Sequence, residues 1–154
     1  MGSSTAELEQ LYRDRYRSFV RVALALLGER EQARDAVQEA FARCLRAQRG
    51  YRGDGGLEPW VYAALVNVCR DALRRGDPPI EPSRTNGRAE PLPELRAAVA
   101  ALPERQRLAV FLRYYADLDY GAIAAALGVQ RGTVAASLHA AHENLRATLK
   151  EGVG

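Results

Sequence analysis

Apolar residues recur at helical spacing along most of the chain, and glycines and prolines divide this pattern into segments. From Leu8 onward, apolar side chains repeat every three to four residues until Gly28 interrupts the run. Ser4 and Glu7 have the spacing of a capping box, in which each side chain accepts a hydrogen bond from the other residue's backbone N–H. The sequence therefore predicts a first helix that begins after Ser4 and ends at Leu27.

Two more helices are expected in the N-terminal half. Apolar pairs step by four through residues 29–49, and Gly50 is a suitable stop. Residues 51–56 have the composition of a loop. Pro59 fits the first turn of a third helix, which reaches Arg75, because its missing N–H needs no partner there. Three amphipathic helices of this length can bury a shared core, so we expect a bundle.

A proline-rich segment separates this block from a second helical block. Residues 76–92 contain four prolines and almost no apolar periodicity, as in an extended, semi-flexible linker. The chain shows no strand pattern. We therefore expect an all-α protein with two small helical domains, residues 1–75 and 93–154, joined by this linker.

The second block carries the spacing of a helix-turn-helix. Asp119 is placed to cap a short helix, Ala124 is small enough for a helix crossing, and Gly128 tolerates the positive φ of the turn. A last helix over residues 131–149 follows, with outward positions that would face a major groove. An ordinary helical hairpin uses the same residues, so this motif alone leaves both DNA binding and plain helix packing open.

Composition excludes several classes of protein. With 47% apolar and 27% charged residues, no apolar run of membrane length and no secretion signal, we expect a cytoplasmic globular protein without membrane insertion. Cys44 and Cys69 stand at apolar helical positions and are expected to be buried thiols. The sequence has no glycine-rich phosphate loop, no paired metal ligands and no nucleophile with a matching base. We therefore expect that the protein is not an enzyme and binds no cofactor or metal.

Charge is distributed unevenly between the two blocks. Residues 1–75 hold 13 arginines and 10 acidic residues, for a net +3, whereas residues 93–154 hold 7 basic and 6 acidic residues, for +1. A DNA-binding domain usually has a plainer basic excess. The second block is therefore a weakly charged candidate for DNA binding.

Two long parts of the chain carry a family resemblance. The first is DAVQEAFARCLRAQRGYRG (35–53) followed by PWVYAALVNVCRDALRR (59–75), and the second is ALPERQRLAVFLRYYADLDYGAIAAALGVQRGTVAASLHAA (101–141). They resemble, in this order, conserved regions 2 and 4 of the extracytoplasmic-function (ECF) class of bacterial sigma factors. The resemblance implies a promoter-specificity subunit that binds core RNA polymerase and promoter DNA and has no chemistry of its own. It also makes an anti-sigma factor a candidate partner.

The resemblance implies roles for residues of region 2. The helix that docks on core polymerase matches residues 35–45, which makes Asp35, Gln38 and Glu39 the candidate contacts, while Phe41 is interpreted as core. Trp60 is able to stack on a base but is also interpreted as core. The candidate contacts to the −10 element are Arg52, Asn67, Arg70, Arg74 and Arg75.

The recognition helix departs from the family pattern. The family commonly places Lys or Arg at five positions where this chain has Ala135, Ser137, Ala140, His142 and Asn144. The remaining candidate contacts to the −35 element are Arg131, Thr133, Ser137 and His139. Because each lost phosphate contact weakens binding, we hypothesise that region 4 binds its −35 element weakly and that promoter choice depends on region 2 or on a helper protein. His139 and His142 are three apart, but without acidic or thiol partners we do not expect a metal site.

Two alternatives to a complete sigma factor stay open at this point. One is a sigma-like regulator or partner subunit that binds polymerase but cannot initiate alone. The other is an interaction module whose C-terminal helices bind a protein, such as an anti-sigma factor, instead of DNA.

Overall fold

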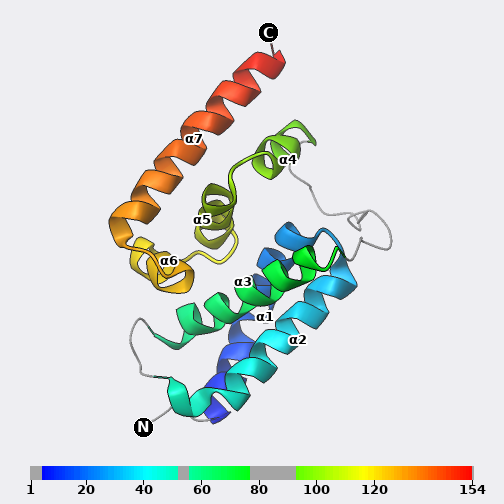
Figure 1. The fold of residues 1–154 in the computed structure, drawn as a ribbon, viewed down its shortest axis with the longest axis vertical. Helices are drawn as coiled ribbons and strands as arrows, with labels where there is room; N and C mark the ends of the chain where they lie inside the picture. The colour runs from blue at the N-terminus through cyan, green and yellow to red at the C-terminus, as the bar shows by residue number, and fades with distance from the viewer. Residues whose placement is uncertain (1–4, 52–55, 77–92, 154) are drawn as a thin grey trace.

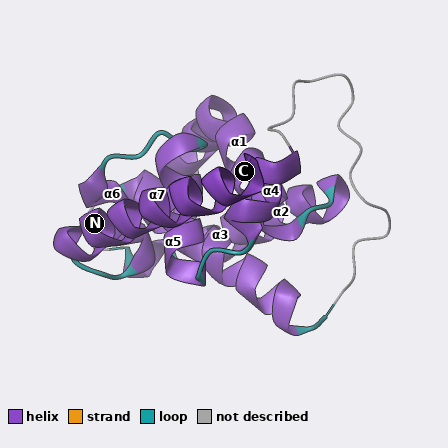
Figure 2. Ribbon diagram, turned by 90° about the horizontal axis from the view of Figure 1, so that it is seen from above, coloured by secondary structure: helices purple, strands orange, loops and turns teal. Residues whose placement is uncertain are grey.

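The computed structural model describes residues 5–51, 56–76 and 93–153, and all regular structure within them is helical (Figures 1 and 2). The elements are α1 (Thr5–Leu27), α2 (Arg30–Arg46), the short 3-10 helix η1 (Gln48–Gly50), α3 (Leu57–Arg74), α4 (Pro93–Ala100), α5 (Glu104–Tyr114), α6 (Tyr120–Leu127) and α7 (Arg131–Val153). The all-α prediction is confirmed. Ser4 of the predicted capping box and residues 77–92 of the predicted linker lie outside the described residues.

Helices α1, α2 and α3 form a bundle around an aromatic centre. Phe19 is fully buried, its ring lies edge-on to Phe41 with centroids 5.1 Å apart, and it lies 4.2 Å from the ring of Tyr62. Aromatic side chains bury more apolar surface than any others, so these three rings dominate the core of the bundle. The interpretation of Phe41 as a core residue is confirmed, since only 6% of it is exposed.

Helix α2 is shorter at both ends than its sequence pattern predicts. Glu29, predicted as the first helical residue, is the N-cap, and its carboxylate accepts hydrogen bonds from the backbone N–H groups of Glu31 and Gln32 at 3.0 and 2.9 Å. These bonds satisfy donors that have no partner inside the helix and hold the pKa of Glu29 below its usual value. At the other end α2 stops at Arg46, because the chain tightens into η1.

The helix-turn-helix prediction is confirmed as a fold. The Asp119 carboxylate caps α6 by accepting from the backbone N–H of Ala122 at 2.8 Å. Gly128 ends α6 with φ +68°, a conformation that strains side-chain-bearing residues, and Ala124 is buried at the crossing. Helix α7 then packs on α4, α5 and α6 through Val134 and its other buried positions. It continues to Val153, beyond the predicted end at Leu149.

The two helical blocks are not separate bodies. Helix α3 packs directly on α6, and one cluster of buried apolar residues runs from Leu8 in α1 to Ala141 in α7. Figure 1 shows α6 beside α3, while α7 extends away from the N-terminal bundle. The sequence predicts each block but not this contact. None of the helices in the described residues combines the length and apolar character of a bilayer span.

Candidate nucleic-acid interface

Helix α3 presents most of the predicted −10 contacts on one face. Asn67, Arg70 and Arg74 are spaced by three and four residues, which places them one above another on the helix surface. Asn67, Arg74 and the C-cap residue Arg75 are exposed, and Arg70 is half-exposed. Arg52 lies outside the described residues. The structure thus brings together four of the five predicted residues at the C-terminal half of α3.

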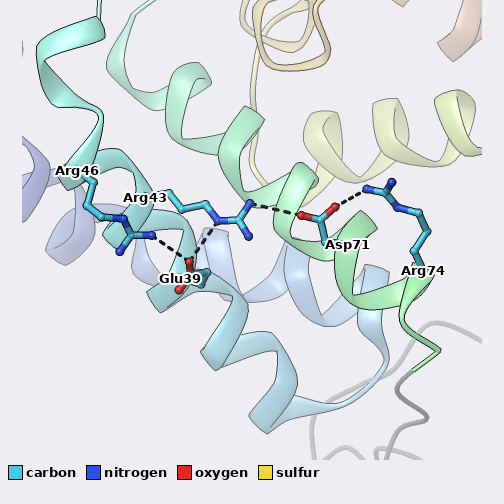
Figure 3. A network of polar contacts seen from close by, with 5 residues as sticks. All are labelled: Glu39, Arg43, Arg46, Asp71 and Arg74. Carbon is cyan, nitrogen blue, oxygen red and sulfur yellow. Dashed lines mark hydrogen bonds and ion pairs between the residues drawn. The ribbon is translucent and has the colours of Figure 1, made fainter.

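Two of these arginines already have acidic partners. Arg70 donates from Nη2 and Nε to the Glu104 carboxylate of α5, at 2.7 and 3.0 Å. Arg74 pairs with Asp71, one turn before it. Asp71 also accepts from Arg43 of α2 at 3.5 Å (Figure 3). Glu104 and Asp71 therefore pair with the guanidinium groups of Arg70 and Arg74 within the chain, a feature that the sequence pattern does not reveal.

The predicted polymerase contacts share one face of α2. Asp35 and Gln38 are exposed, while Glu39 is half-buried and accepts from Arg43 Nε and Arg46 Nη2, both at 3.2 Å (Figure 3). Hydrogen bonds from Arg43 and then Arg46 hold the pKa of Glu39 below its usual value. Arg43 therefore connects Glu39, on the predicted polymerase face of α2, with Asp71 on α3.

A groove runs beside this face, between α1 and α2. Its volume is about 400 Å³, and its lining is largely apolar. The lining residues are Thr5, Leu8, Glu9, Tyr12, Arg13, Gln38, Phe41, Ala42 and Leu45. Leu45 is 40% exposed at the groove and adds apolar surface to it. The groove and Gln38 thus form one continuous surface.

Two aromatic rings flank the loop before α3. Tyr51 precedes the loop and Trp60 lies in the first turn of α3, with ring centroids 4.9 Å apart. Trp60, interpreted from sequence as core, packs against the core but is only partly buried. Tyr51 was not singled out from the sequence, although an aromatic residue directly before a glycine-rich loop is a usable signal. Such rings are platforms on which nucleic-acid bases stack.

The exposed surface of α7 is nearly uncharged in its first three turns. Arg131 is the sole Lys or Arg among positions 131–142. Arg131 and His139 are exposed, whereas Thr133 and Ser137 are half-buried beside the core face. Ala135 occupies an exposed position between them. The four predicted −35 residues are present on the helix, but only one carries a permanent charge.

Two of the positions where the family commonly has basic residues serve a different purpose here. The His142 Nε2 atom lies 2.9 Å from the Tyr114 hydroxyl, and the Asn144 amide donates to the Gln106 side chain at 2.8 Å. Tyr114 and Gln106 both belong to α5. His142 and Asn144 therefore fasten α7 to α5, which is a structural use of these positions.

Both cysteines are buried, unpaired thiols, as predicted from their positions. Burial raises the pKa of the Cys44 thiol to about 11 and that of Cys69 to about 12, because a thiolate is poorly solvated in an apolar core. Within the described ranges, no three His, Cys, Asp or Glu side chains gather in a way that could hold a metal ion.

Comparisons with known proteins agree with this architecture. The family model of sigma-70 region 2 matches residues 11–78, and that of sigma-70 region 4 matches residues 92–145. The chain is 30% identical to the ECF RNA polymerase sigma factor SigE of Mycolicibacterium smegmatis, over 90% of this chain and 60% of the relative's length. It is 32% identical to the ECF sigma-E factor of Escherichia coli, over 71% of this chain and 69% of that protein.

Solved structures share the fold. The sigma factor RpoE of Bartonella quintana, crystallised with the anti-sigma factor NepR, matches with a TM-score of 0.76 and 19% identity, over 95% of this chain and 98% of that one. CnrH, solved with the cytosolic domain of CnrY, matches with a TM-score of 0.74 and 18% identity, over 97% and 91% of the two chains. An N-terminal bundle followed by a helix-turn-helix domain is thus the shared architecture. The chain belongs to the ECF class of bacterial RNA polymerase sigma factors.

Proposed function

We propose that this chain directs core RNA polymerase to specific promoters and assists melting at the −10 element, without catalytic chemistry of its own. The observation that carries the proposal is the order of its two family regions, each with its candidate contact surface exposed. The chain spans 60% of the length of SigE, so the activity is proposed from the regions that are present. We expect it to act in the cytoplasm, where bacterial polymerase works.

The polymerase-docking surface in this proposal is the outer face of α2. Asp35 and Gln38 are exposed there, and the exposed side chain of Leu45 lines the adjacent groove. Acidic and amide groups next to an apolar groove suit a partner helix that carries basic residues beside apolar ones. Glu39 also contacts the polymerase in this proposal, once a basic residue of the polymerase replaces Arg43 or Arg46 as its ion-pair partner.

The −10 interface in this proposal is the C-terminal half of α3 with the loop before it. Asn67 is exposed and offers both a donor and an acceptor to a base edge. Arg70, Arg74, Arg75 and Arg52 bind phosphates, while Tyr51 and Trp60 offer ring faces to unstacked bases.

Region 4 contributes less to promoter binding in this proposal. Arg131, Thr133, Ser137 and His139 contact the −35 element with a single permanent charge among them. Counterion release scales with the number of phosphates neutralised, so such a helix binds duplex DNA weakly. Promoter choice therefore depends mainly on region 2.

An anti-sigma factor is a further proposed partner. Two solved structures with the same fold are complexes, one with the anti-sigma factor NepR and one with the cytosolic domain of CnrY. A pure interaction module is the second candidate function, and the near-absence of charge on the first turns of α7 is the observation that favours it.

Run-off transcription with purified core polymerase on candidate promoters tests the proposal. We expect the wild-type chain to yield promoter-specific transcripts and Gln38→Arg to lose polymerase binding and transcription together. Arg17→Ala, which removes an exposed charge from α1, is the control and should behave as wild type. If the wild-type chain binds polymerase but yields no transcript on any promoter, the interaction module or partner subunit is the better account.

A further inference from the structure

Helix α5 and the segment that follows it are held against the N-terminal bundle by arginines of α1. Arg15 donates from Nη2 to the backbone carbonyl of Ala116 at 2.5 Å, while its Nε bonds the Glu58 carboxylate of α3 at 2.6 Å. Arg21 lies over the ring of Tyr115, 5.1 Å from the centroid. These contacts cross from region 2 to region 4 and adjoin the packing of α3 on α6.

The ion pair between Arg70 and Glu104 also crosses from region 2 to region 4. Two nitrogens of Arg70 bond one carboxylate oxygen of Glu104, so in this arrangement the guanidinium is paired with a residue of region 4. Both side chains are about half exposed, at 41% and 52%, which leaves the pair within reach of solvent and of an approaching anion. A DNA phosphate would take the position of the Glu104 carboxylate, because both anions bind the guanidinium edge in the same way.

The packed arrangement is also incompatible with simultaneous binding to both promoter elements. By their names the −10 and −35 elements are about 25 base pairs apart, which at about 3.4 Å of rise per base pair is about 85 Å. The residues proposed to contact them lie on α3 and α7, both of which pack on α6, and α7 with its 23 residues is only about 35 Å long. The two regions therefore have to separate before both elements are bound, and the ion pair must break in that step.

We propose that Glu104 is an internal competitor for the DNA phosphate that Arg70 binds, so that the packed form of the chain has a reduced affinity for single-stranded DNA. The inference rests on the proposed function, because it takes Arg70 as a DNA contact. Glu104 is the first residue of α5, so the competitor moves with region 4. Separation of the regions exposes Arg70 at the same time as it frees region 4 for the −35 element.

Fluorescence anisotropy with the full chain and labelled mixed-sequence single-stranded DNA tests the competition, because phosphate contacts do not depend on sequence. We expect Glu104→Gln to tighten binding by about two- to five-fold, the range that an exposed ion pair can withhold. The salt dependence of log K should steepen by about 0.7, the value of one added phosphate contact on a single strand. Glu94→Gln, which removes the same charge from exposed α4, should change neither quantity.

A double-mutant design separates failure of this inference from failure of the proposed function. Arg70→Ala should weaken DNA binding, and Glu104→Gln should have no further effect in that background. If Arg70→Ala weakens binding but Glu104→Gln alone does not tighten it, the competition is overturned and the DNA contact stands. If Arg70→Ala leaves binding unchanged, the proposed role of Arg70 is wrong, and the competition falls with it. A thermal-unfolding cycle on the same four proteins then reports whether the ion pair forms in solution.

Discussion

Helices α3 and α7 are built alike on the inside and differ on the outside. Each buries a leucine-centred face, with Leu65 fully buried in α3 and Leu138 only 2% exposed in α7. On the outside, α3 carries Arg70 and Arg74, whereas α7 carries Ala135 at a comparable exposed position. The comparison teaches that the inward residues determine the fold of each region, while in the proposed function the outward residues determine how strongly each region binds DNA.

The shared core gives the largest expected effect. Leu65→Ala in α3 and Leu138→Ala in α7 should each lower the free energy of unfolding by about 2–5 kcal/mol, since each leaves a cavity among buried side chains. Because the apolar cluster is continuous across both regions, we expect each variant to shift one common urea transition followed by circular dichroism. Two separate transitions, only one of which moves in each variant, would show that the regions unfold independently.

Adding charge to α7 should reduce the difference between the two helices. Ala135→Lys places a cation on the exposed face near the start of the recognition helix, and we expect tighter binding to duplex DNA with a salt slope steeper by about 0.9. Ala147→Lys adds the same charge farther along the same helix and is the matched control. Equal slopes for the two variants would mean that position 135 does not face the DNA.

The two thiols give a smaller effect that belongs to region 2 alone. Cys44 lies in α2 and Cys69 in α3, and burial raises the pKa of the Cys44 thiol from 9.0 to about 11. The folded chain therefore holds this proton more tightly than the unfolded chain, so the thiol contributes full stability below pH 9. That contribution should decrease as the pH rises from 9 through 11. Urea melts across this range should show the decrease in the wild type and a weaker dependence in Cys44→Ala/Cys69→Ala.

The sequence predicts the helices well because their cores are periodic and their ends carry local signals. Asp119 and Gly128 act on neighbours within four residues, so their roles in the helix-turn-helix are visible in the pattern. The packing of α3 on α6 and the ion pair between α3 and α5 leave no such signal. Arg70 and Glu104, for example, are 34 residues apart, and each has the appearance of an ordinary surface charge.

The candidate sites could be predicted less completely than the helices. The faces of α2 and α3 follow from helical spacing once the family is known, which places Gln38 and Asn67 correctly on exposed surfaces. The partners of Glu39 could not be predicted, because which of several nearby arginines bonds a carboxylate depends on side-chain geometry. Likewise, the bond from His142 to α5 is invisible in a pattern that only records a missing basic residue.

The most direct test of the central claim, that promoter binding depends on α3 more than on α7, is permanganate footprinting of open complexes formed by core polymerase with matched variants. One variant combines Asn67→Ala, Arg70→Ala and Arg74→Ala, and the other combines Arg131→Ala, Thr133→Ala, Ser137→Ala and His139→Ala. Both should still bind core polymerase. We predict that the α3 variant loses reactivity of the melted −10 strand and that the α7 variant retains most of it. Loss of the open complex in the α7 variant, with retention in the α3 variant, would contradict the account.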